Sequence, residues 1–383
     1  MTAAALEQAA SLMLDFAART GLVSDRPPRR YLWTDAFAVC NFLALARETG
    51  DASYRKLALD LVEQVHRVLG RHRDDDVRRG WLSGLDEREG ALHPTRGGLR
   101  IGKPLPERPP GAAFDERLEW ERDGQYFHYL TQWMRALDRV ARVTREARFN
   151  QWARELADVA HRRFATGTAG RGRRMFWKMS IDLSRPLVPS MGQHDPLEGL
   201  IVCLELRATA AELGGAPDLP SLEDAVADFA DMIEGRDFAT ADPLGLGGLL
   251  TNACRIAQRL GASAPGCCEL LDALLAAALE GLSRYSRQAE LHRPASQRLA
   301  FRELGLAIGL EALGRIEREA KLTPSRFPSG VRVRLDSLSH YRALAPAIES
   351  YWLDPSRRKD RSWEEHRDIN DVMLATCVLP EAV

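Results

Sequence analysis

Apolar residues recur every three or four positions along most of this chain, and that spacing predicts an almost entirely helical protein. In residues 54–69 the side chains of Leu57, Leu61 and Val65 fall on one face of a helix, and charged side chains fall on the opposite face. This amphipathic pattern indicates a helix with one face in water. It recurs in residues 149–164, 222–233 and 269–282.

A second kind of helical segment is apolar or small on nearly every side. Such a helix has no face suited to water, so it has to be surrounded by other parts of the protein. One of these segments carries Gly305 and Gly309 four positions apart, which would let a neighbouring backbone approach closely. The segments of this kind are residues 36–46, 197–211, 244–258 and 299–314.

The two kinds of helix alternate along the chain, and their order predicts the fold class. We expect an all-α (α/α)6 toroid of about twelve helices, with the apolar helices inside and the amphipathic ones outside. No linker rich in Pro, Gly or Ser divides the chain, so we expect residues 1–383 to form a single domain. The expected elements are an outer helix near 4–20, five inner and outer pairs that begin near residues 34, 124, 196, 243 and 298, and a last inner helix near 367–379.

Two connections, residues 70–122 and 165–194, are much longer than the others, and both lead from an outer helix to an inner one. Because parallel inner helices all begin at the same end of a toroid, both connections should lie at that end, which we call the mouth. Long ordered loops on a rigid scaffold commonly carry binding sites. The N-termini of the inner helices also meet there, and their free N–H groups favour anions.

Composition excludes several classes of function. The formal net charge of -1 gives no overall electrostatic basis for binding nucleic acid. No apolar run is long enough to cross a bilayer, and residues 1–18 lack the basic stretch of a secretory signal. The six cysteines include no C-x-x-C pair and are expected to be reduced. We therefore expect a cytoplasmic protein that binds neither nucleic acid nor membrane.

The residues at the predicted mouth resemble those of a known group of proteins. Trp33, Thr34 and Asp35 open the first inner helix, and the sequence DGQYFHYLTQWMRAL, residues 123–137, opens the second. Together with the alternating helices, they make the chain similar to the six-hairpin glycosidase-like proteins, which include unsaturated glucuronyl hydrolases, glucoamylase-like enzymes, sugar epimerases and polysaccharide lyases. The resemblance implies a carbohydrate-sized pocket at the mouth, walled by aromatic rings.

Two acidic residues are the leading candidates for chemistry. Glycoside hydrolysis needs a proton-donating carboxyl group and a second carboxylate, one on each side of the bond. Thr34 can cap its helix, which would leave the carboxylate of Asp35 free beside Trp33. Asp123 precedes a helical first turn that is rich in polar side chains. We therefore predict that Asp35 and Asp123 form the catalytic pair.

Two further residues are candidates for the same chemistry. His194 ends the second long connection and could act as an acid or a base at neutral pH. Glu303 lies within an apolar inner helix, where a charge is costly unless it is paired or hydrated. Glu303 is therefore expected either to pair with an arginine or to face a water-filled cavity, and pairing is favoured.

Asp195 and Asp242 are each followed by a proline, a pattern typical of an Asp that caps a helix ahead of Pro in the first turn. Capping is the favoured interpretation of both, although Asp195 also falls among the candidate binding residues. Frequent basic residues in the long connections favour an anionic sugar. The predicted substrate-binding residues are Trp33, Tyr126, His128, Trp177, Lys178, Arg185, Asp195, Trp363 and His366.

These observations predict a glycoside hydrolase that acts on a small-molecule carbohydrate and uses no cofactor and no metal ion. Two alternatives stay open. A sugar epimerase or isomerase would transfer protons at carbon with a pair of histidines drawn from His128, His194 and His366. A non-catalytic carbohydrate-binding or scaffold protein would keep the toroid without the chemistry.

Overall fold

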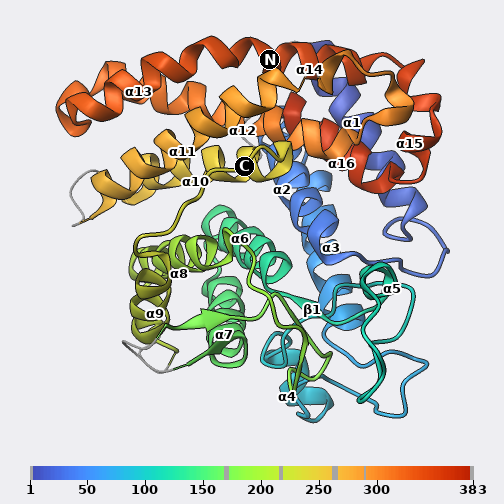
Figure 1. The fold of residues 1–383 in the computed structure, drawn as a ribbon. Helices are drawn as coiled ribbons and strands as arrows, with labels where there is room; N and C mark the ends of the chain where they lie inside the picture. Colours follow the sequence, from blue (N-terminus) through green and yellow to red (C-terminus); the bar gives the residue numbers. More distant parts are fainter. Residues whose placement is uncertain (1–2, 168–171, 215–218, 261–265, 289, 380–383) are drawn as a thin grey trace. The chain divides into compact units, whose positions relative to one another are not determined.

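The computed structural model describes two compact units, and helices make up most of both (Figure 1). The first unit consists of residues 17–234, and the second consists of residues 1–16 together with 235–383. Each unit is described by itself below. The expectation of a single domain over residues 1–383 stays a prediction. The described residues are 3–167, 172–214, 219–260, 266–288 and 290–379.

In the first unit the longer helices follow one another as three pairs. Each pair consists of two helices in contact, and α6 also contacts α2 and α8. These are the pairs that the sequence predicts. The pairs are α2 (Leu32–Thr49) with α3 (Ala52–Leu69), α6 (Phe127–Thr144) with α7 (Ala147–Phe164), and α8 (Asp195–Leu213) with α9 (Glu223–Ile233). Helix α1 (Ala3–Arg19) begins in the second unit and ends in the first.

Burial distinguishes the two kinds of helix within a pair. In α2 most side chains are buried, including the polar side chain of Asn41. In α3 the buried side chains, such as Leu61 and Val65, lie on one face, and Arg55 and Lys56 are exposed. The hydrophobic pattern therefore predicted correctly which helix of this pair is enclosed.

Short elements hold the long connections against these helices. Strand β1 pairs antiparallel with β4, and β4 pairs antiparallel with β5, so that the strand order is β1-β4-β5. Because β1 runs directly into α6, this small sheet fixes the second long connection at the start of α6. The elements are α4 (Glu87–Leu92), α5 (Glu116–Glu121), β1 (Gln125–Tyr126), β4 (Lys178–Met179), β5 (Pro186–Val188) and the antiparallel pair β2 (Ala165–Thr166) and β3 (Arg174–Met175).

In the second unit α12 (Ala300–Leu322) contacts α10 (Pro243–Arg255), α14 (Leu344–Leu353) and α16 (Arg367–Val378). The backbones of α10 and α12 approach one another closely. A Cβ atom on Gly309 would lie only 2.6 Å from the Cα of Gly247, which no side chain could tolerate. This confirms the expectation that glycine permits a close backbone approach here.

The remaining elements of the second unit are shorter or lie around α12. They are α11 (Cys267–Arg287), α13 (Ser329–Ser339), α15 (Arg361–Glu364), the π-helix Ile256–Leu260 and the 3-10 helices Glu290–His292, Ala295–Gln297, Pro324–Arg326, His340–Ala343 and Arg357–Lys359. Within the described ranges, no helix is both long enough and apolar enough to cross a bilayer. All six cysteines lie in these ranges and are free thiols.

Candidate functional site

The first turns of α2, α6 and α8 meet in the first unit through side-chain hydrogen bonds. Trp33 of α2 donates its indole N–H to Nε2 of His128 on α6 over 3.1 Å. The Nδ1 atom of His128 lies 2.7 Å from Oε2 of Glu198 on α8. Asp195 begins the same turn of α8, three residues before Glu198. We call Trp33, His128, Asp195 and Glu198 the Asp195 centre.

Asp195 is a buried acid without a hydrogen-bond donor to one of its oxygens. The residue is 5% exposed, and its Oδ2 atom has no partner among the described residues. Burial, reinforced by the negative charge of Glu198, raises the pKa of Asp195 to about 7. A Cβ atom on Gly192 would lie 2.5 Å from the Cγ of Asp195, so the carboxyl group occupies space that only a glycine leaves free. Asp195 can therefore hold a proton at neutral pH.

Glu198 is buried in the same turn and has the opposite tendency. Burial alone would raise its pKa, but the contact with His128, the charge of Arg135 and a 2.9 Å hydrogen bond from the Thr131 hydroxyl together lower the pKa of Glu198 to about 2. The two carboxyl groups of one helical turn are thus held in different protonation states. Such a pair can divide the roles of acid and base between its members.

The sequence assigned different roles to these residues. Asp195 does not cap α8: the N-cap is His194, which makes no capping side-chain hydrogen bond, and Asp195 is already helical. Asp242, in contrast, does cap α10 by accepting from the N–H of Gly245 over 2.8 Å. Glu198 was not among the site residues predicted from the sequence. The signal that could have indicated it is a charged residue one turn after Asp195, inside an otherwise apolar segment.

A row of aromatic rings lies beside the starts of α2 and α6. The hydroxyl groups of Tyr31 and Tyr129 lie 2.6 Å apart, and Tyr129 contacts Tyr126 with ring centroids 5.2 Å apart. Tyr126 stacks on Trp177 at 5.3 Å, and Trp177 contacts Trp120, which is 44% exposed. We call these five residues the aromatic row. It includes Tyr126 and Trp177, two of the rings predicted to bind sugar.

The structure gives Asp35 partners at the start of α2 that the sequence did not predict. Its Oδ2 atom accepts a hydrogen bond from the backbone N–H of Tyr31 over 2.9 Å, and its Oδ1 atom lies 3.5 Å from the buried guanidinium of Arg30. Thr34 does not cap α2, and its hydroxyl group has no hydrogen-bond partner among the described residues. Asp35 therefore stabilises the start of α2, and its catalytic role stays a prediction.

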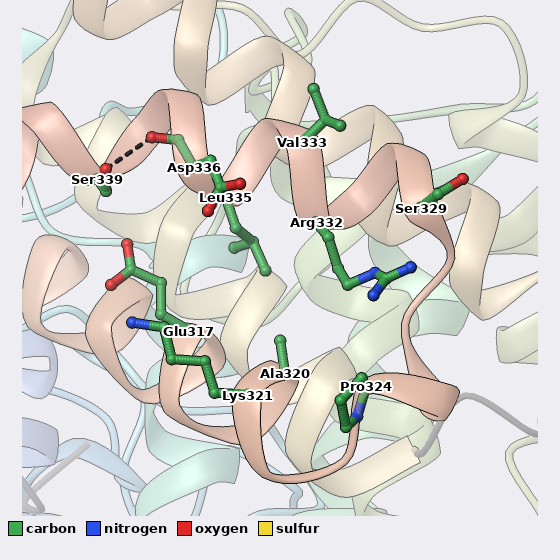
Figure 2. Close-up of a pocket in the computed structure, with 10 residues that line it drawn as sticks. All are labelled: Glu317, Ala320, Lys321, Pro324, Ser329, Arg332, Val333, Leu335, Asp336 and Ser339. Carbon is green, nitrogen blue, oxygen red and sulfur yellow. Dashed lines mark hydrogen bonds between the residues drawn. The ribbon is translucent and has the colours of Figure 1, made fainter.

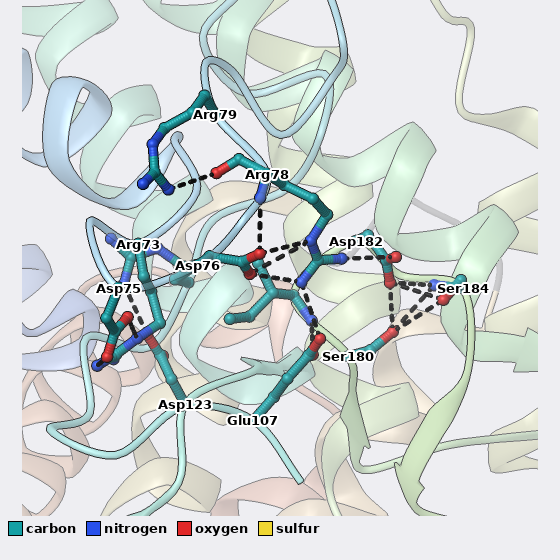
Figure 3. A network of polar contacts seen from close by, with 12 residues as sticks. Arg73, Asp75, Asp76, Arg78, Arg79, Glu107, Asp123, Ser180, Asp182 and Ser184 are labelled. Carbon is teal, nitrogen blue, oxygen red and sulfur yellow. Dashed lines mark hydrogen bonds and ion pairs between the residues drawn. The ribbon is translucent and has the colours of Figure 1, made fainter. Parts of the chain in front are cut away.

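Asp123 likewise accepts hydrogen bonds from neighbouring groups of the protein (Figure 3). Its Oδ2 atom lies 2.6 Å from Arg100 and 3.3 Å from Arg73, and its Oδ1 atom accepts from the N–H groups of Gly102 and Gly124 over 3.0 Å each. We call Asp123 with these four donors the Asp123 clamp. A carboxylate that is fully buried and saturated with donors is a poor candidate for catalysis, because ionised Asp123 has no lone pair aimed at a substrate.

A neighbouring arginine ties further loops together. Arg78 contacts Asp76 over 2.7 Å, Glu107 over 3.0 Å and Asp182 over 2.9 Å, and Figure 3 shows its guanidinium group between these three acids. The contacts join residues that lie up to 104 positions apart in the sequence. The acidic run at residues 74–76 thus helps to fix the long connections.

The cations predicted to bind an anionic sugar also donate hydrogen bonds to other groups of the protein. Lys178 is fully buried, and its ammonium group donates to the Glu119 side chain and to the carbonyl groups of Glu119 and Arg122. Arg185 donates to the carbonyl group of Arg108. Lys178 is not available as a substrate ligand without breaking these bonds, because an ammonium group has only three N–H donors.

Three predicted residues belong to the second unit. Glu303 accepts two hydrogen bonds from Arg298, over 2.8 and 2.6 Å, and a third from the indole of Trp352 over 2.8 Å. The predicted pairing of Glu303 with an arginine is therefore correct. Trp363 is 1% exposed, and the ring of His366 contacts the ring of Phe301.

The second unit also has a surface groove of about 560 Å³ between α12 and α13 (Figure 2). Its lining includes Glu317 and Lys321 from α12 and Arg332 and Asp336 from α13. It contains none of the residues that the sequence predicted for the site. Over the described part of the chain, no three His, Cys, Asp or Glu side chains are placed to hold a metal ion.

No protein-family model and no curated protein matches this chain. Solved structures do match it. The α-1,6-mannanase GH76A of Salegentibacter sp. HEL1_6 has a TM-score of 0.52, with 12% sequence identity over 99% of this chain and 98% of that chain. An inactive variant of the same mannanase, with two consecutive aspartates replaced by alanine and α-1,6-mannotetrose bound, also has a TM-score of 0.52, with 13% identity over the same shares.

This likeness spans nearly the whole chain, so it establishes the fold. The chain has the all-α (α/α)6 toroid fold of the six-hairpin glycosidases, as the alternation of its helices predicted.

Proposed function

We propose that this chain is a glycoside hydrolase in which Asp195 donates the proton and Glu198 supplies the second carboxylate. The observation that carries the proposal is the opposite displacement of the two pKa values within one turn of α8, upward for Asp195 and downward for Glu198. A protonated acid and an ionised carboxylate are the two groups that cleavage of a glycosidic bond requires.

In this proposal Asp195 protonates the glycosidic oxygen as the bond to the sugar breaks. Glu198 accepts hydrogen bonds through Oε2 from His128 and Thr131. The ionised carboxylate of Glu198 can stabilise the developing positive charge of the sugar or orient water. The aromatic row supplies apolar ring faces beside the same helix starts.

We propose neutral, α-linked manno-oligosaccharides as the first substrates to examine. The solved α-1,6-mannanase with the same fold supports this class. The hydrogen bonds of the Lys178 ammonium group to protein acceptors support a neutral sugar over an anionic one. Lys103 lies over the ring of Tyr31.

The acids of this chain are arranged differently from those changed in the inactive mannanase. Consecutive aspartates occur here only at Asp74, Asp75 and Asp76. Hydrogen bonds from Arg73 and Arg78 lower the pKa values of Asp75 and Asp76, that of Asp76 to about 2, and hold both in salt bridges. This observation favours separate acids such as Asp195 and Glu198, and it also supports a second candidate function, a carbohydrate-binding protein without turnover.

The histidine-pair epimerase receives less support. Both ring nitrogens of His128 are engaged, one by Trp33 and the other by Glu198. A histidine that abstracts a proton from carbon needs one nitrogen free to face the substrate.

The test is hydrolysis of aryl α-mannosides and α-1,6-manno-oligosaccharides by the wild type, Asp195→Asn and Glu198→Gln. We expect each substitution to lower kcat/KM by about a hundredfold to ten-thousandfold, the contribution of general acid–base groups. Glu212→Gln, an exposed acid farther along α8, is the matched control and should retain full activity. Turnover that survives both substitutions would rule out the pair, and saturable binding without turnover would favour the binding protein.

A further inference from the structure

We infer that Trp33 fixes His128 as the neutral tautomer with its proton on Nδ1. His128 is then the positioning residue of the site: it keeps Glu198 ionised, so that the proton shared by the two acids stays on Asp195. The inference deepens the proposed function, since it explains how two acids of one helical turn acquire different roles. It is carried by the direction of two hydrogen bonds.

The first bond determines which nitrogen of the ring carries hydrogen. An indole N–H can only donate a hydrogen bond, so Nε2 of His128, 3.1 Å from Nε1 of Trp33, has to accept. The single proton of a neutral imidazole is then on Nδ1. A proton added to Nε2 would face the Trp33 N–H and break the bond.

The second bond uses that proton. Nδ1 of His128 lies 2.7 Å from Oε2 of Glu198, so its N–H donates to the carboxylate, and the Thr131 hydroxyl donates to the same oxygen over 2.9 Å. Two donors on one carboxylate favour its ionised form. Asp195 has no donor on Oδ2, so in this pair of neighbouring acids the proton stays on Asp195.

Burial and the nearby charged groups act on His128 in opposite directions. Burial disfavours its charged form, whereas Glu198 and, more weakly, Asp195 raise its pKa, and Arg135 on its own helix lowers it. The net direction is upward, so Glu198 draws a proton toward the ring while the Trp33 N–H blocks the nitrogen that would receive it. Trp33 is therefore the residue whose removal should let His128 become charged.

The chain contains an internal reference for this inference. Trp133 donates to Nε2 of His66 over 3.1 Å, the same geometry as Trp33 with His128. His66 is buried, and this burial lowers its pKa to about 3. His66 should therefore remain neutral over the range in which His128 is examined.

The experiment is a titration of the full chain by nuclear magnetic resonance, with ¹⁵N-labelled histidine and ¹³C-labelled Asp and Glu carboxyl groups, and it needs no substrate. Signals are assigned by their loss in His128→Asn, Asp195→Asn, Glu198→Gln and His66→Asn. We expect the Nδ1–H tautomer for His128 at pH 7.5, and an Asp195 that titrates above Glu198. An Nε2–H tautomer, an imidazolium at that pH, or an Asp195 that ionises before Glu198 would overturn the inference.

Two pairs of variants separate positioning from general structure. The side-chain amide nitrogen of Asn takes the place of Nδ1 of histidine, and that of Gln takes the place of Nε2. His128→Asn should therefore preserve the low pKa of Glu198, whereas His128→Gln should raise the titration midpoint of Glu198 by at least about one pH unit. Trp33→Phe should raise the titration midpoint of His128 by a similar amount, and Trp133→Phe should leave it unchanged. Equal behaviour within either pair would contradict the inference.

The outcomes distinguish this inference from the proposed function. The expected titrations without turnover of any glycoside would leave the positioning of the proton intact and remove the hydrolase. Turnover that depends on Asp195 and Glu198, but with His128 charged at pH 7.5, would retain the hydrolase and overturn the role of His128.

Discussion

The Asp195 centre and the Asp123 clamp are two buried acidic sites of the same unit with opposite surroundings. Asp123 is 0% exposed and receives four donors, two of them arginines, so it is stable as an anion. Asp195 is 5% exposed, and its Oδ2 atom receives none, so it is stable as a neutral acid. Burial alone therefore does not indicate function. The number of donors around a buried carboxyl group decides whether it holds the fold together or holds a proton.

The largest effect is expected from breaking the Asp123 clamp. Arg100→Met should lower the free energy of unfolding by about 3–5 kcal/mol, because it leaves a buried carboxylate with too few partners. Urea denaturation measures the change. Arg79→Met, an exposed arginine in the neighbouring loop, should change stability by less than about 0.5 kcal/mol. A loss as small as that of the control would show that Asp123 is not the anchor of these loops.

A smaller effect, dependent on pH, is expected at Asp195. Its pKa rises from 3.8 in the unfolded chain to about 7 in the folded protein, so between these values the folded state holds a proton that the unfolded state has lost. This contribution to stability therefore declines as the pH rises from 4 to 7. Asp195→Asn cannot ionise, so its stability relative to the wild type should increase by on the order of 3 kcal/mol between pH 5 and pH 8. Parallel curves of unfolding free energy against pH for the two proteins would contradict the assignment.

A third substitution removes the space beside the Asp195 carboxyl group without changing any charge. The methyl group of Gly192→Ala would collide with the Asp195 carboxyl group, at a cost of about 2 kcal/mol for overpacking. The displaced carboxyl group should also lose its elevated pKa, which carboxyl ¹³C titration would detect. Gly248→Ala in α10 is a control for loss of a glycine, since no atom lies within 4 Å of the added methyl group and the backbone there is helical. An unchanged Asp195 midpoint in Gly192→Ala would show that this space is not required.

The sequence was sufficient to predict the helices because their signal is local. A period of 3.6 residues and the contrast between enclosed and amphipathic segments depend on neighbours within a few positions, and both are confirmed in the first unit. The cap at Asp242 is local in the same way, since its acceptor and donor lie three residues apart. The alternation of helices then predicted the (α/α)6 fold.

The site was harder to predict because its contacts are not local. Asp195 and Asp242 have the same Asp-Pro pattern, yet Asp195 is a buried acid whose Oδ2 atom has no partner among the described residues, and Asp242 is a cap. The difference depends on Glu198 and on His128, which lies 70 residues from Glu198 in the sequence. The same limit explains why the contacts of Asp123 were not predicted, since its partner Arg73 is 50 residues away. The binding roles predicted for Tyr126, Trp177 and His366 stay predictions.

The contact between α10 and α12 has a mechanical consequence. Where Gly247 meets Gly305 and Gly309, two backbones touch without side chains between them, so there are no rotamers to absorb relative sliding. The two helices should therefore move together as one rigid body. Slow local unfolding of the second unit should be confined to its other elements. Amide hydrogen exchange in α10 and α12 should then be the slowest of that unit.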